Sequence, residues 1–297
     1  MTPGLAGIRL DQTLAALSGL ARRRVRALAG AGRVWVNQQP ARVLSRALEV
    51  GDVVDVLPGE EMLRPSPPPE MLRVLYEDAW VVAVDKPYGL VTQPPARRLP
   101  GEVTVHERVL IQLARRDGRR PELRLFHRLD RLTTGVLVLV RTHEAARALA
   151  AAWQTGQVRK RYLALVDGDP GQGERLVEGP VGRDLLLPGK YRVTGRGRPA
   201  RSLVRRLATT GATSLVEVRP LTGRTHQVRV HLAHLGIPVA GDRLYGGSDA
   251  VPRPFLHAWR LTVPHPADAR SLELSSPIPV DMAAMAHTLG LRSPVID

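Results

Sequence analysis

Asp130 is an acid placed among cations near the middle of the chain. His127 and Arg128 precede it, and Arg131 follows it directly. Carboxylates in perturbing surroundings gather at functional sites, so Asp130 is a candidate for chemistry. The same sequence also fits a loop carboxylate that merely pairs with a neighbouring arginine. The rest of the chain has to decide between these two interpretations.

Three histidines form the other arrangement that could do chemistry. On a helix, His231 and His234 could converge on a metal, with His226 nearby, but no carboxylate joins them at ligand spacing. We therefore expect no metal site. The chain contains no cysteine, which excludes disulfides, thiolate catalysis and cysteine-ligated metals. Oxygen and nitrogen side chains must do whatever chemistry occurs.

A rigid strand is predicted directly after Asp130. The aliphatic run 136–140 is short and rich in valine, which is typical of a strand buried on both faces. Asp130 would then lie on the loop that enters this strand. Thr142 is placed to cap an alanine-rich helix, and residues 159–166 predict a further strand. In that strand Tyr162 would ordinarily anchor the sheet.

The C-terminal half adds a predicted strand at 213–220 and a helix after it. Thr225 can cap this helix and Gly236 can end it. Arg229 lies one turn into the helix and away from its apolar positions. Residues 167–200 are rich in glycine and proline, and we expect them to be loop-like.

Residues 8–56 predict a small unit of two short helices and short strands. The second helix, at 21–29, has a polar face made of arginine. A basic helix face is often simply solvated. Here the basic character continues beyond the helix, and no acid occurs between Leu20 and Arg46. The arginines that we expect to contact a partner are Arg22, Arg23, Arg26, Arg33 and Arg42.

Composition favours a polyanionic partner. The chain of 297 residues has a formal net charge of +15, which is typical of proteins that bind nucleic acid. All but three of its 43 basic residues are arginine. Codon bias can raise the arginine count, but it does not by itself produce a surplus of cations over acids. No apolar run approaches a membrane span and the N-terminus lacks a signal-peptide pattern, so we expect a cytoplasmic protein.

Four motifs resemble those of the RluA-type pseudouridine synthases, in the same order along the chain. The string His-Arg-Leu-Asp-x-x-Thr-Thr-Gly around Asp130 resembles the catalytic motif of that family. The others are Asp-Lys-Pro-Tyr-Gly-Leu at 85–90, Lys-x-Tyr-x-Ala at 160–164, and Thr-Gly-Arg-Thr-His-Gln-Val-Arg-Val-His-Leu at 222–232. Thr134 stands where the family usually has serine, and residues 91–94 are unusual. These departures bear on substrate choice rather than on chemistry.

Residues 8–57 resemble the alpha-L RNA-binding motif first seen in a ribosomal small-subunit protein. Together the two resemblances imply an α+β fold. The catalytic domain, residues 73–297, would be built on a mixed, mostly antiparallel central sheet flanked by helices and loops. A proline-rich linker at 61–72 would join it to a small N-terminal α+β RNA-binding domain, residues 1–60.

The family resemblance implies that Asp130 is the nucleophile and that Tyr162 lies in the active site. Burial beside a nucleobase would raise the pKa of an aspartate, so a permanently cationic arginine must face it, and Arg229 fits that role. The proton on carbon five of uracil would leave to Tyr162, to Tyr245 or to water. The other residues expected at the substrate are Arg128, which would fill the gap left by a flipped base, Leu256, which would pack on the uracil, and Thr225, Gln227 and Tyr245.

The resemblance implies isomerisation of uridine to pseudouridine in RNA, with no cofactor. The aspartate could add to the sugar or to the ring, and both routes stay open. The N-terminal appendage favours ribosomal RNA of the large subunit as the substrate, and we expect a monomer without membrane contact. Two alternatives remain: a non-catalytic RNA-binding ribosome-assembly factor on the same fold, and a nucleoside or glycoside hydrolase that would release free uracil.

Overall fold

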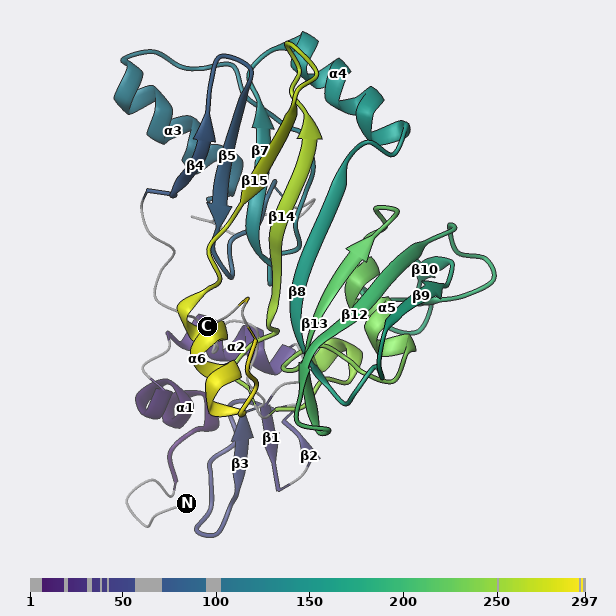
Figure 1. The fold of residues 1–297 in the computed structure, drawn as a ribbon. Helices are drawn as coiled ribbons and strands as arrows, with labels where there is room; N and C mark the ends of the chain where they lie inside the picture. The colour runs from purple at the N-terminus through teal and green to yellow at the C-terminus, as the bar shows by residue number, and fades with distance from the viewer. Residues whose placement is uncertain are drawn as a thin grey trace. The chain divides into compact units, whose positions relative to one another are not determined.

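The computed structural model divides the chain into two compact units, Met1–Arg64 and Pro65–Asp297 (Figure 1). It describes residues 7–18, 21–30, 34–37, 39–41, 43–56, 71–94, 103–249, 251–293 and 295. Residues 61–70 of the expected linker lie outside the described residues, as do Arg33 and Arg42. No helix in the described part of the chain is long and apolar enough to cross a membrane.

The N-terminal unit packs two short helices against a small antiparallel sheet. The helices are α1 (Leu10–Ser18) and α2 (Arg22–Gly30), and the strand order is β2 (Gln39–Pro40), β1 (Val34–Val36), β3 (Val54–Val56). Leu10, Val25 and Leu48 are buried at the centre of its core. The predicted helices and strands are confirmed. The sequence also predicts a turn at residues 38–40, and this is wrong for Gln39 and Pro40, which pair with β1 as β2.

The second unit is organised around a ten-stranded sheet with the order β4-β5-β7-β14-β8-β13-β12-β9, in which β15 pairs with β14 and β6 with β7. The pair β7–β14 is parallel, and the other described pairs of this sheet are antiparallel. The mixed, mostly antiparallel sheet is therefore confirmed. Its strands are β4 (Val74–Glu77), β5 (Val81–Lys86), β6 (Arg124–Leu125), β7 (Thr134–Val140), β8 (Arg159–Asp167), β9 (Glu174–Glu178), β12 (Arg201–Thr209), β13 (Thr213–Pro220), β14 (Leu256–Pro264) and β15 (Ser271–Ser275).

Helices cover both faces of this sheet. The remaining elements are α3 (Val105–Asp117), α4 (His143–Gln154), α5 (Gln227–His234), α6 (Val280–Thr288), the 3-10 turn η2 (Arg243–Tyr245) and a hairpin of β10 (Val181–Arg183) and β11 (Tyr191–Val193). Alternate residues of β7 face opposite layers: Leu137 and Leu139 pack in the cluster of α3, whereas Val136 and Val138 pack in that of α4. The strand predicted to be buried on both faces is confirmed.

The segment 167–200 differs from expectation. It was expected to be loop-like, but it contains β9 on the sheet edge and the β10–β11 hairpin. The strands are short, and in β9 only Val177 is buried. An edge strand with a single buried residue has no alternating apolar pattern, so its sequence resembles a polar loop.

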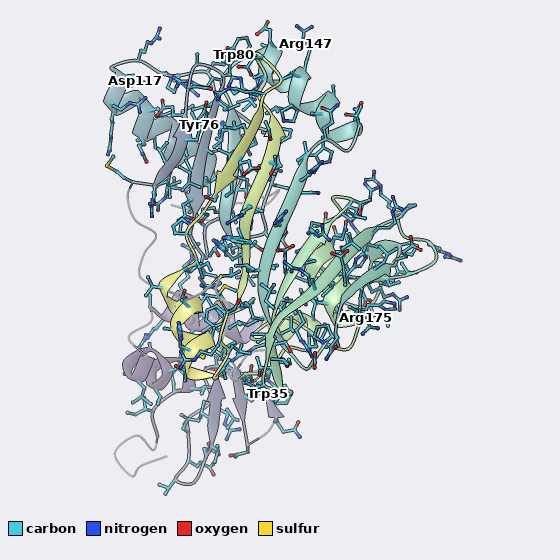
Figure 2. The ribbon with its side chains drawn as sticks, in the orientation of Figure 1. Trp35, Tyr76, Trp80, Asp117, Arg147 and Arg175 are labelled. Carbon is cyan, nitrogen blue, oxygen red and sulfur yellow. The ribbon has the colours of Figure 1, made fainter. Side chains whose placement is uncertain are left out.

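The β4–β5 turn holds an acid whose hydrogen bonds are all made within the turn and its neighbours. Asp78 accepts from the backbone N–H groups of Trp80 at 2.7 Å and Val81 at 2.8 Å through Oδ1. Its Oδ2 accepts from the Tyr76 hydroxyl at 2.8 Å and contacts His265 Nε2 at 2.6 Å. Tyr76 and Trp80 lie together at this end of the sheet (Figure 2).

Candidate active site

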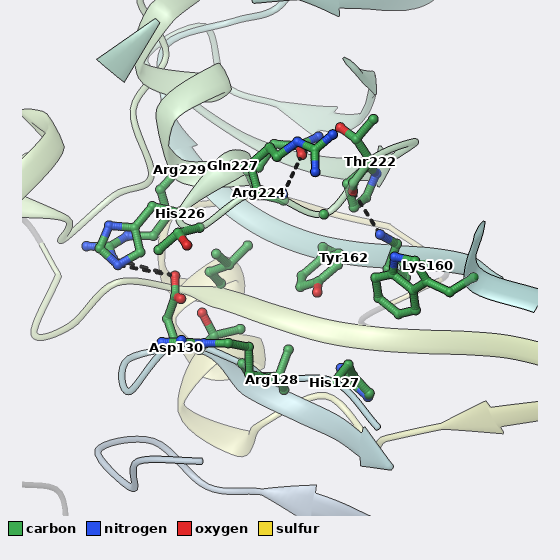
Figure 3. Close-up of a pocket in the computed structure, with 18 of the residues that line it drawn as sticks. His127, Arg128, Asp130, Lys160, Tyr162, Thr222, Arg224, His226, Gln227 and Arg229 are labelled. Carbon is green, nitrogen blue, oxygen red and sulfur yellow. Dashed lines mark hydrogen bonds and ion pairs between the residues drawn. The ribbon is translucent and has the colours of Figure 1, made fainter. Parts of the chain in front are cut away.

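A cavity of about 230 Å³ brings together residues from β8, the Asp130 loop and the segment that enters α5 (Figure 3). Of the residues proposed from sequence, it is lined by Asp130, Tyr162, Arg229, Arg128, Thr225, Gln227 and Leu256. Tyr245 does not line it. Asp130 is the single carboxylate among the described residues around the cavity.

The loop of Asp130 is fixed at its exit by Gly135. This residue has φ of +114°, and β7 runs parallel to β14 there, with Gly135 opposite Ala258. A Cβ on Gly135 would lie 2.2 Å from the Ala258 carbonyl oxygen. Both the backbone conformation and the close approach therefore require glycine. The Thr134 hydroxyl, 2.9 Å from His257 Nδ1, adds a further contact between the two strands.

Lys86 holds the same loop through hydrogen bonds to its backbone. It is fully buried, and its ammonium group donates to the carbonyls of Arg131 at 3.1 Å and Thr133 at 2.7 Å. Burial lowers the pKa of Lys86 to about 7, although the nearby charge of Asp130 opposes this shift. Sequence reasoning gave Lys86 no role. The signal was a lone lysine at the end of an aliphatic strand, within the motif 85–90.

Arg229 faces Asp130 and is itself held by a second acid. Its Nη1 lies 3.7 Å from Asp130 Oδ2, while Nε and Nη2 donate to both oxygens of Asp242 at 2.6 and 2.8 Å. The side chains of Arg229 and Asp242 are only 4% and 1% exposed. Burial opposes the charged guanidinium, but the hydrogen bonds and charge of Asp242 hold the pKa of Arg229 above its usual range. Asp242, which was not singled out from the sequence, thus fixes the cation in place.

His226 is a second group that faces the nucleophile candidate. Its Nε2 lies 3.8 Å from Asp130 Oδ2 (Figure 3). Its Nδ1 lies 2.8 Å from the Tyr245 hydroxyl oxygen. That oxygen already accepts from the Tyr191 backbone N–H at 3.0 Å, so the Tyr245 hydroxyl is free to donate to Nδ1. Burial lowers the pKa of His226, against the opposing charge of Asp130. A neutral His226 then carries its proton on Nε2, directed at Asp130.

His226 also sets where α5 begins. It has φ of +57°, and no side chain caps the helix, which starts at Gln227. The expectation that Thr225 caps a helix beginning near Arg224 is therefore wrong, because the left-handed turn at His226 separates both from the helix. The expected end is confirmed, since α5 stops at His234 and Gly236 has φ of +76°.

Tyr162 lies on β8 beside this group, where it pairs with Val218 of β13. Burial and the charge of Asp130 both raise the pKa of its hydroxyl, so the side chain is a neutral phenol at neutral pH. Leu256 is buried at the start of β14. Arg128 is exposed at the cavity rim and has no hydrogen-bond or ion-pair partner within the described residues.

Gln227 lines the cavity, but its side-chain amide is hydrogen-bonded within the protein, to its own segment and to β12. Its Nε2 donates to the Arg201 carbonyl at 2.8 Å and to the Ser202 hydroxyl at 3.0 Å. Its Oε1 accepts from the Thr222 hydroxyl at 2.7 Å and the Arg224 N–H at 3.0 Å. The two bonds to Oε1 hold the 222–227 segment in shape, and the two bonds from Nε2 attach it to β12.

The three histidines do not gather. His231 is buried, with Nε2 at the Gly179 carbonyl and Nδ1 at the Ser202 hydroxyl, whereas His234 is exposed. Across the described ranges, no group of three or more histidine, aspartate or glutamate side chains could hold a metal ion.

The arginine face of the N-terminal unit has the exposure expected of a binding surface. Arg22, Arg23 and Arg26 are exposed on α2, whose opposite side carries Val25 and Leu28 into the core. Arg26 Nη2 lies 3.7 Å from Asp11 Oδ2, so this cation is partly neutralised within the unit.

The fold and this site define an RNA pseudouridine synthase, and the chain belongs to the RNA pseudouridylate synthase family, whose profile matches residues 80–234. The S4 domain profile matches residues 8–54 and confirms the alpha-L resemblance. The chain is accordingly an isomerase with an RNA-binding appendage.

Named relatives agree with this assignment. The chain is 36% identical to the ribosomal large subunit pseudouridine synthase D of Nitrosomonas europaea, over 96% of this chain and 85% of that protein. It is also 36% identical to the dual-specificity RNA pseudouridine synthase RluA of Escherichia coli O6:H1, over 71% of this chain and 96% of that one. Among solved structures, human RNA pseudouridylate synthase domain containing 4 matches with a TM-score of 0.62 at 28% identity, covering 75% of this chain and 94% of the human chain.

Proposed function

We propose that this protein isomerises specific uridines of large-subunit ribosomal RNA to pseudouridine, with Asp130 as the nucleophile and the target base flipped out of its stack. The observation that carries the proposal is the arrangement around one carboxylate. Arg229 Nη1 and His226 Nε2 both approach Asp130 Oδ2, at 3.7 and 3.8 Å. Within the described residues, the other oxygen, Oδ1, has no hydrogen-bond or ion-pair partner, which leaves it available to attack.

The reaction needs only the atoms of the substrate and the carboxylate. Asp130 adds to the anomeric carbon of the ribose or to the uracil ring, and the bond between the sugar and the ring nitrogen breaks. The base turns, and carbon five bonds to the same sugar carbon as the carboxylate is released. Carbon five then loses its proton, and the ring nitrogen freed from the sugar takes up a proton, so the product is an isomer of the substrate. Arg229 keeps a permanent positive charge beside Asp130, because a guanidinium cannot give up its proton in this setting.

Tyr162, which lines the cavity, would form the wall on which the uracil lies. A neutral phenol with a raised pKa is a poor base, so its role as proton acceptor depends on passing its own proton onward. Its aromatic ring can stack on the base without any proton transfer. Replacement of Tyr162 by phenylalanine separates these two roles, since the ring stays and the hydroxyl is lost.

Flipping the target base costs a few kcal/mol unless a loop already exposes it. Arg128 would offset this cost, and its support is that its unpaired guanidinium is exposed at the cavity rim, where it can enter the gap left in the RNA stack. Buried Leu256 offers an apolar contact for the extruded base. The pairing of rim cation and apolar floor suits a nucleobase that enters from a structured RNA.

Two similarities to known proteins support ribosomal RNA as the substrate. The relative matched over 85% of its length is named for the ribosomal large subunit, and the S4 domain adds a second RNA-binding surface. Modification of ribosomal RNA would place the protein in the cytoplasm. A hydrolase would need a second working carboxylate, but Asp242 is buried with both oxygens bound to Arg229.

The function is tested by incubating the purified protein with large-subunit RNA that lacks modifications. We expect pseudouridine at discrete positions, mapped by carbodiimide-stopped reverse transcription, with RNA mass unchanged and no free uracil. Release of uracil would favour the hydrolase. Tight binding without any modified position would favour the non-catalytic assembly factor.

A further inference from the structure

Strands β8 and β13 separate next to the active cavity. They pair from Asp167 to Tyr162, where Tyr162 is opposite Val218. Before that point, residues 159–161 of β8 pair with β14, while β13 continues to Pro220. The two strands therefore form a fork, visible in Figure 1 as the widening space between β8 and the end of β13.

A second cavity, of about 330 Å³, occupies this fork. It shares four lining residues with the Asp130 cavity: Trp153, Lys160, Pro220 and Thr222. Lys160 Nζ donates to the Thr222 carbonyl at 2.8 Å and lies 4.4 Å from the centre of the Trp153 ring (Figure 3). The two cavities are thus neighbours with a common wall, and the fork cavity begins where the active cavity ends.

The fork cavity is lined by arginine and lysine side chains. No aspartate or glutamate occurs among the described residues around it. Arg219 is paired with Glu174 and Glu217, but Arg159 and Arg161 are exposed, and their side chains have no hydrogen-bond or ion-pair partner in the described chain. Lys160 stays mostly protonated at neutral pH, because burial lowers its pKa only to about 8. Two unpaired guanidinium groups at the mouth of a cavity can bind an anion such as a phosphate.

The distance from the active cavity suits a neighbouring nucleotide. Lys160, which lines both cavities, and Tyr162 are two residues apart on one face of β8, roughly 7 Å along the strand, whereas Arg159 and Arg161 project from the opposite face and line the fork cavity. Successive phosphates of a stacked strand lie about 3.4 Å apart along its axis. A strand whose target uridine lies against Tyr162 therefore reaches the fork within one or two nucleotides.

We propose that the fork between β8 and β13 is a second RNA subsite, which holds a nucleotide flanking the target uridine and binds its phosphate through Arg159 and Arg161. The inference rests on the proposed function, since it takes RNA as the substrate. The subsite contacts backbone and not base edges, so it positions the strand without reading its sequence. Trp153 forms the wall between this nucleotide and the target uridine.

The test is the double variant R159A/R161A against a matched pair, R119A/R120A. Both pairs are exposed arginines of the same unit whose side chains have no hydrogen-bond or ion-pair partner in the described chain, so each variant loses two charges. Arg119 and Arg120 line a different surface, with Arg116 and Glu122. We expect R159A/R161A to weaken binding of a single-stranded RNA roughly tenfold and to lower the slope of log affinity against log salt by about 0.7 per lost phosphate contact. The control pair should leave the slope unchanged.

Three further measurements make the outcome decisive. The rate at saturating RNA should stay within about twofold of wild type, and R159K/R161K should restore the salt slope because it restores the charges. With a truncated RNA that consists of the target uridine without a flanking nucleotide on either side, R159A/R161A should bind as the wild type does. The proposal is overturned by an unchanged slope in R159A/R161A, by an equal loss in the control pair, or by an equal loss on the truncated RNA. Binding is measured without turnover, so a wild-type protein that forms no pseudouridine would defeat the proposed function separately.

Discussion

Asp78 and Asp130 are two acids that precede buried strands of the same sheet, yet their surroundings are opposite. Their side chains are similarly exposed, at 24% and 20%. Asp78 has both oxygens occupied by donors at 2.6 to 2.8 Å. In Asp130, Oδ2 faces Arg229 and His226, but both donors lie beyond hydrogen-bond distance. Its Oδ1 has no hydrogen-bond or ion-pair partner in the described chain.

This difference separates an acid that stabilises the fold from one that is available for chemistry. A carboxylate whose lone pairs all accept hydrogen bonds within the protein stabilises the folded state. The side-chain oxygens of Asp130 accept no hydrogen bond within the described chain, although Lys86, Gly135 and β7 hold its loop rigidly. Rigid mounting with unsatisfied oxygens is the arrangement expected of a group that bonds its substrate.

Replacement of Asp130 by asparagine should have the largest effect on rate. We expect turnover to fall about ten-thousandfold or more, because the amide cannot act as the nucleophile, while RNA affinity stays within a few-fold. The assay is tritium release from RNA labelled at carbon five of uridine. The free energy of unfolding should be unchanged or higher, since active-site groups are often placed at a cost to stability. Turnover above a hundredth of wild type would reject the nucleophile assignment.

Arg229→Lys should have the second-largest effect on rate, with turnover reduced about a hundredfold. Lysine keeps the charge but cannot bind Asp242 with two parallel hydrogen bonds while reaching Asp130. Arg253→Lys is the matched control, because Arg253 is equally buried and binds both oxygens of Asp281 at 2.6 and 2.7 Å. Both variants should lose stability in thermal unfolding, but only Arg229→Lys should lose its rate. Equal rate losses would reduce Arg229 to a structural residue.

Asp78→Asn should change stability and leave the rate nearly intact. Burial opposes ionisation of Asp78, but its hydrogen bonds with His265 and with the turn lower its pKa from 3.8 to about 2. A lowered folded-state pKa gives stability that is present above the unfolded pKa and is lost as pH falls towards 2. We expect the variant to be about 2 kcal/mol less stable at pH 6, with the gap closing near pH 2. Denaturant unfolding across this range is the measurement, and a gap independent of pH would contradict the account.

The smallest effect should come from the exposed cations of the N-terminal unit. Changing Arg22, Arg23 and Arg26 to alanine should lower the slope of log affinity against log salt by about one unit per lost phosphate contact. The effect of Arg26 should be the weakest, because Asp11 lies near it. Turnover at saturating RNA should be spared, since recruitment does not stabilise the transition state. A collapse of the saturating rate would mean that this face helps to build the active site.

The sequence was sufficient for elements that carry a local signal. The valine-rich run after Asp130 is β7, Thr142 caps α4 by accepting from the Ala145 N–H at 3.0 Å, and the predicted strand 213–220 is β13. The motifs also placed Asp130, Tyr162 and Arg229 around one cavity. All of these depend on short-range patterns or on strings of adjacent residues.

The partners that tune the site could not be predicted, because they come from distant segments. Asp242 reaches Arg229 from the turn before η2, and Lys86 reaches the Asp130 loop from β5. The orientation of His226 depends on Tyr245 and on the Tyr191 N–H of the β10–β11 hairpin, within the segment expected to be loop-like. The left-handed backbone at His226, which displaced the helix start, has no signature in composition.

The central claim, that Asp130 forms a bond to the substrate, is tested most directly by acid-quenching the wild-type enzyme during turnover and mapping the linked peptide by mass spectrometry. We predict an RNA fragment attached to the peptide that contains Asp130, and no attachment in Asp130→Asn under the same conditions. Attachment at another residue, or rapid turnover with no linked species at any quench time, would contradict the account.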